Sequence, residues 1–382
     1  MAKELPPVDI GIYGITVVSI SYAMYAVGLD FYTYSTRDLI QRPKSEWFYY
    51  IKKQIKLILI NYLALLPIIF ILLVGFISPI FSLLVIVIII VEHINQESMR
   101  LLIADNRAFL ASNILFVRSG LWCYVSVVLM EYGWVAKNIL SVLVLWLIFS
   151  IVALALSIYS LKYIFSIKEK INKVKPKWLS SGLKVCIPLL VSTLMMRTIT
   201  TIDRFWMEKI DGLELVGVYS FYFGVAGSLI AFLDSGVFSF YYPKLIAVKN
   251  NFLEFKLIVR EMLYKTVIIT FLISLVLCLI VPYILMWIDK EIYISNTLMF
   301  YVVLIANIFY CLSMIPHYIL YAKSFDKAIV FSHAVSLLVF ILFAIVFVEM
   351  AVSLSIVYSV LISYLFLFLV KCILVYILES KS

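Results

Sequence analysis

Long apolar runs restrict the folds open to this chain more than any other feature of its sequence. Runs of the length that a helix needs to cross a bilayer, about 20 residues, recur from Ile10 to Ile377. Hydrophobic residues make up 65% and charged residues 14% of the 382 positions, against roughly 45–50% and about 25% in soluble domains. No water-soluble core takes up so much apolar surface. We therefore expect a polytopic membrane protein without a sizeable soluble catalytic domain.

The apolar runs predict an all-α fold with about eleven transmembrane helices. Transmembrane β-strands alternate apolar and polar residues over about 10 positions, and these runs do not. The predicted helices cover residues 10–29, 57–77, 80–104, 108–130, 138–160, 183–202, 215–237, 266–287, 293–321, 328–348 and 350–377.

The net charge of +9 is typical of a membrane protein that carries basic residues at its cytoplasmic edge, so we expect no nucleic-acid partner. Alternate loops of the predicted topology carry 24 basic residues on one side and 5 on the other. Because positive charge is retained on the cytoplasmic side, the C-terminus is expected inside and the N-terminus outside.

An internal similarity at an offset of 206 residues divides the chain into two halves. Gly11-Ile12-Tyr13 corresponds to Gly217-Val218-Tyr219, each at the start of an apolar run. An even number of helices separates the two segments, so the halves are expected as parallel repeats, as in some transporters. The predicted domains are an N-terminal lobe over 1–161, a basic cytoplasmic linker over 162–182 and a C-terminal lobe over 183–382.

Two arginines, Arg118 and Arg197, lie inside predicted helices, where an unpaired charge is costly. Their guanidinium groups suit the oxygens of a phosphorylated substrate. An internal salt bridge, with Glu92 as the acid, is the alternative interpretation.

The predicted helix over 80–104 carries Glu92, Gln96 and Arg100 at successive i, i+4 positions. This spacing predicts one polar stripe along the helix. Glu92 is a candidate for H⁺ or Na⁺ coupling, because burial favours protonation of a carboxylate. The alternative is a structural stripe whose last turns stand in cytoplasm.

Charges at three predicted helix ends are candidates for coupling or gating. Asp30 and Asp234 close equivalent helices near the cytoplasmic face, and Asp203-Arg204 ends a helix at the outer face. The alternative interpretation is that all four are interfacial caps. Arg204 joins the two intramembrane arginines as a substrate-binding candidate.

No catalytic residue, metal site or cofactor is expected from the sequence. His93, His317 and His333 fall on different helices without metal-ligand spacing, and no nucleophile motif, glycine-rich phosphate loop or cysteine cluster is present. An ATP-driven pump is therefore excluded, and the chain is not expected to be an enzyme.

Several segments together resemble the polysaccharide transporter (Wzx-type O-antigen flippase) family of the multidrug/oligosaccharidyl-lipid/polysaccharide exporter superfamily. They are Gly11-Ile12-Tyr13, Gly28-Leu29-Asp30-Phe31-Tyr32-Thr33-Tyr34-Ser35-Thr36-Arg37, the Glu92-to-Arg100 stripe, Thr201-Ile202-Asp203-Arg204 and Val216-Gly217-Val218-Tyr219-Ser220.

The resemblance implies two six-helix lobes around a cationic cavity in the bacterial cytoplasmic (inner) membrane. It implies a flippase that moves undecaprenyl-pyrophosphate-linked O-antigen units to the periplasmic leaflet by alternating access, in lipopolysaccharide biosynthesis. Membrane lipids and the lipid-linked oligosaccharide would be partners, with a polysaccharide polymerase and a chain-length regulator as further ones. The chain begins where the family's second helix begins, so a misplaced start or a truncation is expected.

Three rival interpretations stay open. One is a drug/cation antiporter of the same superfamily, which predicts an acidic cavity, and another is an O-antigen polymerase, which looks like a protein with a long external loop. The third is a purely structural membrane protein, which predicts that Arg118 and Arg197 are both dispensable.

Overall fold

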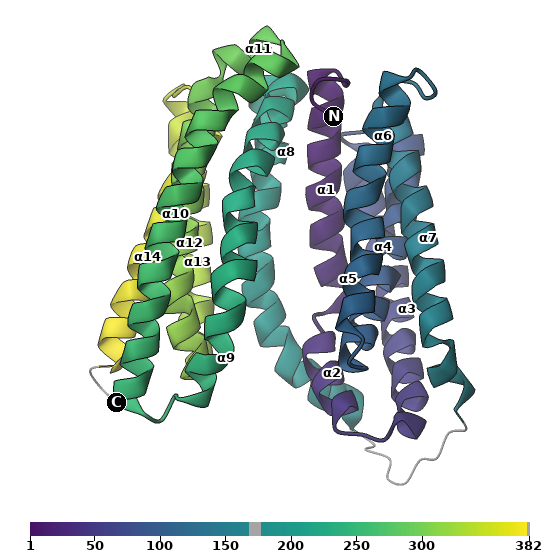
Figure 1. Cartoon of the computed structure of the whole chain (residues 1–382). Helices are drawn as coiled ribbons and strands as arrows, with labels where there is room; N and C mark the ends of the chain where they lie inside the picture. Colours follow the sequence, from purple (N-terminus) through teal and green to yellow (C-terminus); the bar gives the residue numbers. More distant parts are fainter. Residues whose placement is uncertain (168–176, 380–382) are drawn as a thin grey trace. The chain divides into compact units, whose positions relative to one another are not determined.

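The computed structural model describes residues 1–167 and 177–379, and the regular elements in these ranges are all helical (Figure 1). The α-helices are α1 (Pro7–Gly28), α2 (Tyr32–Ile40), α3 (Lys44–Val74), α4 (Pro79–Ala104), α5 (Ala108–Phe116), α6 (Trp122–Glu131), α7 (Ile139–Ser166), α8 (Trp178–Leu233), α9 (Ser239–Ala247), α10 (Phe252–Ile288), α11 (Glu291–Ser295), α12 (Thr297–Ala322), α13 (Asp326–Glu349) and α14 (Ser355–Glu379). Two single π-helical turns, η1 (Val117–Leu121) and η2 (Asp234–Phe238), continue α5 and α8 respectively.

Ten helical stretches of the described residues are long and apolar enough to cross a membrane. One of them, Trp178–Ala247, has 70 residues and is broken at Gly212, where φ is 82° and ψ is 170°. Only glycine adopts this backbone conformation readily. The broken stretch supplies two of the predicted helices, so the all-α fold with about eleven apolar helices is confirmed.

Two helices begin well before the apolar runs that predicted them. α3 begins at Lys44 instead of 57, and α10 begins at Phe252 instead of 266. A helix satisfies its backbone hydrogen bonds internally, so it continues past the apolar run into turns that carry lysine and glutamate. Hydropathy alone locates the apolar part of such a helix.

The surfaces of α3 and α10 are apolar and mostly uncovered by protein. In each, only 11% of the apolar stretch is buried. Leu63 is 81% exposed and Ile71 is 71% exposed. Continuous apolar surface of this extent requires lipid as its solvent, and the chain is therefore a multi-pass membrane protein.

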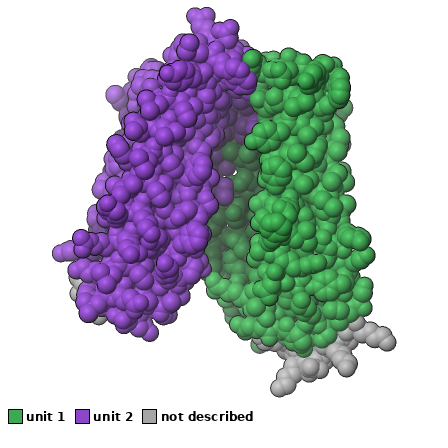
Figure 2. Space-filling model, viewed as in Figure 1, with its two compact units in different colours: residues 1, 3–6, 16–194 green, residues 2, 7–15, 195–382 purple. Residues whose placement is uncertain are grey.

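The chain divides into two compact units (Figure 2). Unit 1 contains residues 1, 3–6 and 16–194, and unit 2 contains residues 2, 7–15 and 195–382. The division passes through α1 between Ile15 and Thr16, and through α8 between Leu194 and Met195.

The predicted linker over 162–182 is described only at its two ends. Residues 162–166 belong to α7 and residues 178–182 to α8, whereas 168–176 lie outside the described residues. The predicted lobes 1–161 and 183–382 stay a prediction.

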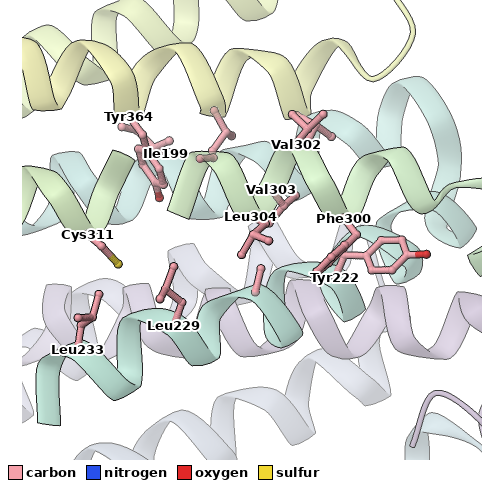
Figure 3. Packing of buried hydrophobic residues seen from close by; sticks show 14 of the residues in the cluster. Ile199, Tyr222, Leu229, Leu233, Phe300, Val302, Val303, Leu304, Cys311 and Tyr364 are labelled. Carbon is pink, nitrogen blue, oxygen red and sulfur yellow. The ribbon is translucent and has the colours of Figure 1, made fainter. Parts of the chain in front are cut away.

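Each unit has its own core. In unit 2, aromatic and aliphatic side chains of α8, α12 and α14 pack together, among them Tyr222, Leu229, Phe300 and Tyr364 (Figure 3). In unit 1, a smaller cluster surrounds Trp178, which lies against Phe31 and Tyr50 with ring centroids 5.1 and 5.0 Å away. The first turns of α8 therefore belong to the core of unit 1.

The repeat glycines Gly11 and Gly217 lie against each other within unit 2. A Cβ at Gly11 would stand 2.2 Å from the carbonyl oxygen of Leu213, and a Cβ at Gly217 would stand 2.0 Å from the carbonyl oxygen of Pro7. The two helix backbones touch here, so each position requires the absence of a side chain.

Candidate functional site

The polar residues of α4 form two groups instead of the single stripe expected from the sequence. At 100° per residue, Glu92 and Asn95 point to one side of the helix, and His93, Glu97 and Arg100 point to another. The first group contacts α7, and the second contacts α3 and α2. The predicted stripe of Glu92, Gln96 and Arg100 is therefore not one group, because Glu92 contacts α7 whereas Arg100 pairs with Glu97, three residues before it.

Glu92 is the centre of the first group. Its carboxylate accepts hydrogen bonds from the Trp146 indole, at 3.1 Å, and from the Ser150 hydroxyl. The Nε of Arg118 lies 3.3 Å from the other carboxylate oxygen. Trp146 is held by stacking on Trp122, with ring centroids 5.4 Å apart and planes 2° from parallel. Glu92 is 5% exposed. The Glu92–Arg118 pair is therefore buried within unit 1.

Arg118 reaches Glu92 from the π-helical turn η1. A π turn inserts one residue into a helix and is frequent at functional sites. The side chain is 12% exposed, and its Nε and Nη1 make no aligned hydrogen bond with any described residue. The salt bridge that the sequence left open as an alternative is therefore present, and two predicted site residues neutralise each other.

The second group joins α4 to α3. The Tyr62 hydroxyl lies 2.7 Å from Nδ1 of His93, and Gln54 donates to Glu97 at 2.8 Å. Arg100 pairs with Glu97 from the next turn. This arrangement places one carboxylate between an amide and a guanidinium group.

Arg100 also stacks on Tyr32, with its guanidinium carbon 3.3 Å from the ring centroid. Burial raises the pKa of Tyr32 to about 12, so the phenol stays neutral at physiological pH. A small cavity of about 50 Å³ opens beside Gln54, Glu97 and Arg100. Close to this cavity, position 28 requires glycine, because a Cβ there would stand 2.9 Å from Nε2 of His93.

Asp203 and Arg204 form a second buried pair, in unit 2. They are 0% and 4% exposed, and Arg204 Nη1 lies 3.1 Å from a carboxylate oxygen of Asp203. Tyr219 donates to the same carboxylate at 2.7 Å, and Arg204 donates to the carbonyl of Thr200 at 2.9 Å. The expected helix end at residue 202 is wrong, because the helix continues to the break at Gly212. A paired charge inside protein does not end a helix.

Arg204 also lies against two aromatic rings, next to a close approach between α1 and α8. Its guanidinium carbon lies 5.1 Å from the Tyr219 centroid and 4.8 Å from that of Phe223. The Nε of Arg204 and the hydroxyl of Ser220 have no hydrogen-bond partner among the described residues. A Cβ at Gly14 would stand 2.0 Å from the Ser220 hydroxyl oxygen.

The other predicted site residues lie outside these two pairs. Asp30 is 6% exposed in the bend between α1 and α2, and the Thr193 hydroxyl donates to its carboxylate at 3.4 Å. Asp234 is exposed at the start of η2, and Arg197 is half-buried on α8. Arg118 belongs to unit 1 and Arg197 to unit 2.

One buried polar cluster was missed from the sequence. Lys371 is one of the 24 basic residues that the sequence assigns to the cytoplasmic side, but it is 1% exposed inside α14. His317 and His333 do lie on different helices, yet their rings stack with centroids 5.9 Å apart. The sequence signal that could have indicated this cluster is Lys371, a lysine inside the last apolar run.

Comparison with known proteins gives a likeness at the level of the fold. No family model and no curated protein matches the sequence. The structure is similar to a multidrug resistance MATE family transporter of the MOP superfamily in an inward-facing conformation, with TM-score 0.79 and 15% identity over 100% of this chain and 93% of that chain. It is also similar to a MATE family transporter in an outward-facing conformation, with TM-score 0.64 and 14% identity over 99% of this chain and 90% of that chain. A MATE structure in the bent conformation gives a TM-score of 0.61 and 14% identity over 100% of this chain and 93% of that chain. The narrower resemblance to Wzx-type flippases is not confirmed, and the fold of this chain is that of MATE transporters.

Proposed function

We propose that this protein is an alternating-access exporter of the multidrug type, which moves organic cations out of the cytoplasm across the bacterial inner membrane. The observation that carries the proposal is the match of the whole chain to MATE transporters solved in inward-facing and outward-facing conformations. A rocking mechanism needs two compact bodies, and the chain folds as two.

The buried ion pairs remove the part of the objection to a cationic substrate that concerns Arg118 and Arg204. Arginines inside the membrane favour an anionic substrate only if they have no acidic partner. In the structure, Arg118 has Glu92 and Arg204 has Asp203 as partners. Each pair is close to neutral, so neither creates the basic cavity that would repel a cation.

Flipping of an undecaprenyl-pyrophosphate-linked oligosaccharide is a second candidate, supported by a specific observation. The Nη1 of Arg118 and the Nε of Arg204 have no hydrogen-bond partner among the described residues. Unused guanidinium donors are the groups that bind phosphate oxygens. Under this alternative, Arg118 in unit 1, and Arg197 and Arg204 in unit 2, are each phosphate-binding candidates within their own unit, while the polyprenyl tail stays in lipid.

The two functions are separated by reconstitution of the purified protein into liposomes. We expect a lipophilic cationic dye to be moved against its gradient when an H⁺ or Na⁺ gradient is imposed. In parallel, flipping of a fluorescent polyprenyl-pyrophosphate oligosaccharide is measured in the same vesicles. Transport of the lipid without transport of the dye would support the second candidate, and transport of neither would contradict both.

Glu92 provides the variant test for ion coupling. Glu92→Gln should abolish gradient-driven transport, because an amide, unlike a carboxylate, binds neither a proton nor a cation. Glu131→Gln is the control, since Glu131 is an exposed carboxylate at the end of α6. Equal loss in both variants would contradict a specific role for Glu92.

A further inference from the structure

The buried histidine of α4, His93, has one ring nitrogen in a hydrogen bond and one without a partner. The Tyr62 hydroxyl of α3 lies 2.7 Å from Nδ1, and the two rings meet edge to face with centroids 5.6 Å apart. His93 is 1% exposed, and its Nε2 has no hydrogen-bond partner among the described residues. An unpaired buried nitrogen is costly, so it indicates a group that binds something in another state of the protein.

The carboxylate of Glu97 faces this nitrogen from the next turn of α4. Its Oε1 lies 4.0 Å from Nε2 of His93, which is too long for a hydrogen bond, and a side-chain movement of about 1 Å closes the gap. Arg100 pairs with the same oxygen, and Gln54 donates to the other one at 2.8 Å. The carboxylate is therefore held in position beside the unpaired nitrogen.

The small cavity beside this carboxylate gives access to it. Its lining includes Glu97 and the hydroxyl residues Ser35 and Thr36 of α2, and its volume of about 50 Å³ has room for water. Ile55, which also lines the cavity, is 46% exposed, and the next residue, Lys56, is exposed as well. The cavity therefore opens near polar turns of α3, and water in it would carry a proton to Glu97.

The space at Nε2 of His93 is too small for any larger ligand. Gly28, the last residue of α1, covers this nitrogen, and a Cβ there would stand 2.9 Å from it. Asn61 of α3 donates to the carbonyl of Val27 at 2.9 Å and so holds the end of α1 in place. A space that does not take a methyl group has no room for a metal ion with its other ligands. The guanidinium group of Arg100 also repels a second cation.

The other ionisable groups around this histidine come from the elements packed against α4. They are Arg100 of α4, Tyr32 of α2, Tyr62 of α3 and Asp30 in the bend between α1 and α2. The helix α5 carries no ionisable side chain, and the α7 side chains bonded to α4 contact Glu92. How tightly His93 holds a proton is therefore set by nearby carboxylates against one guanidinium group.

We propose that His93 and Glu97 form a proton-binding site in unit 1, whose occupancy changes during transport. The proposal rests on the proposed export function and names H⁺, and not Na⁺, as a coupling ion bound apart from Glu92. In the proton-free state, Nδ1 donates its hydrogen to the Tyr62 hydroxyl and Nε2 keeps its lone pair. When Nε2 accepts a proton from water in the cavity, it donates to Oε1 of Glu97, and both ring nitrogens are then paired.

Proton binding is tested first without any transport. The chain has three histidines, so ¹⁵N-histidine labelling gives three sets of NMR signals, and His93→Gln identifies the set from His93. We expect His93 to titrate, Glu97→Gln to weaken its proton binding about tenfold or more, and Arg100→Gln to strengthen it. Glu131→Gln, at an exposed carboxylate on the end of α6, is the control and should leave the titration unchanged.

The opposite signs expected for the two variants separate charge from packing, because a general loosening of the helices would change proton binding in one direction only. Either variant suffices if the other does not fold. A His93 signal that does not titrate while the protein is folded would overturn the proposal. A titration that neither Glu97→Gln nor Arg100→Gln changes would overturn it as well.

The role in transport is tested in liposomes with imposed gradients. A pH gradient should accelerate dye transport, and a Na⁺ gradient should not. His93→Gln and, independently, Glu97→Gln should lose the acceleration, Glu131→Gln should keep it, and unfolding temperatures in detergent show that each variant is folded. A wild-type protein that moves no dye would contradict the proposed export function and leave the histidine titration to decide the proton site. Acceleration that persists in both variants, or that Na⁺ alone produces, would overturn the coupling.

Discussion

Glu92 and Arg118 show how this chain accommodates charge inside membrane-spanning helices. Each buried arginine of an ion pair has a carboxylate in its own unit, and indole or hydroxyl donors occupy remaining acceptor positions. Removing one partner of such a pair leaves an uncompensated buried charge, whereas removing both does not.

The Glu92–Arg118 pair therefore makes a prediction about stability. Arg118→Met alone should destabilise the protein by about 3–5 kcal/mol, and Glu92→Gln combined with Arg118→Met should recover most of this loss. Thermal unfolding in detergent measures both. Equal destabilisation by the single and double variants would show that the two side chains do not interact.

Glu4 and Lys137 make a prediction about pH in a pair outside the spanning helices. The hydrogen bond and ion pair with Lys137 lower the pKa of Glu4, because they favour its charged form. A lowered pKa contributes stability above the unfolded value of 4.5, and this is lost as pH falls through the folded pKa.

The expected effect is small because Lys137 is half-exposed. Glu4→Gln should lower the unfolding temperature slightly at pH 7 and leave it unchanged at pH 3. A difference that persists at pH 3 would mean that lost packing, and not the ion pair, causes it.

At the scale of elements, the crossing of α1 and α8 depends on glycine. Gly217 lies against the backbone of α1, whereas nothing lies within 4 Å of a Cβ at Gly224 on the same helix. The repeated Gly-aliphatic-Tyr segment in the sequence thus marks a place where two helix backbones touch.

These two glycines give a matched pair of variants. Gly217→Ala should destabilise the protein by about 1–3 kcal/mol through overpacking, and Gly224→Ala should stabilise it by about 0.5–1 kcal/mol through helix propensity. The unfolding temperature of each variant in detergent checks the sign. A neutral Gly217→Ala would mean that the helices separate at little cost.

At the scale of the whole molecule, the basic residues predict one orientation in the membrane. The segments 133–138 and 289–290 connect helices on the expected outer side, and 323–325 connects helices on the inner side. Because alkaline phosphatase is active only outside the cytoplasm, fusions at 135 and 290 should be active and a fusion at 324 inactive. The reverse pattern would place the C-terminus outside.

The sequence determined the solvent, the fold class and the helix count, because each depends on local apolar runs that must be as long as the bilayer is thick. It also identified Glu92 and Arg118 as charged residues inside predicted membrane-spanning helices, where a charge requires a partner or a functional role. Tertiary structure alone decided their pairing, the continuation of α8 through Asp203-Arg204, and the stacking of His317 on His333. Partners on separate helices are brought together by helix rotation and crossing, which hydropathy does not specify.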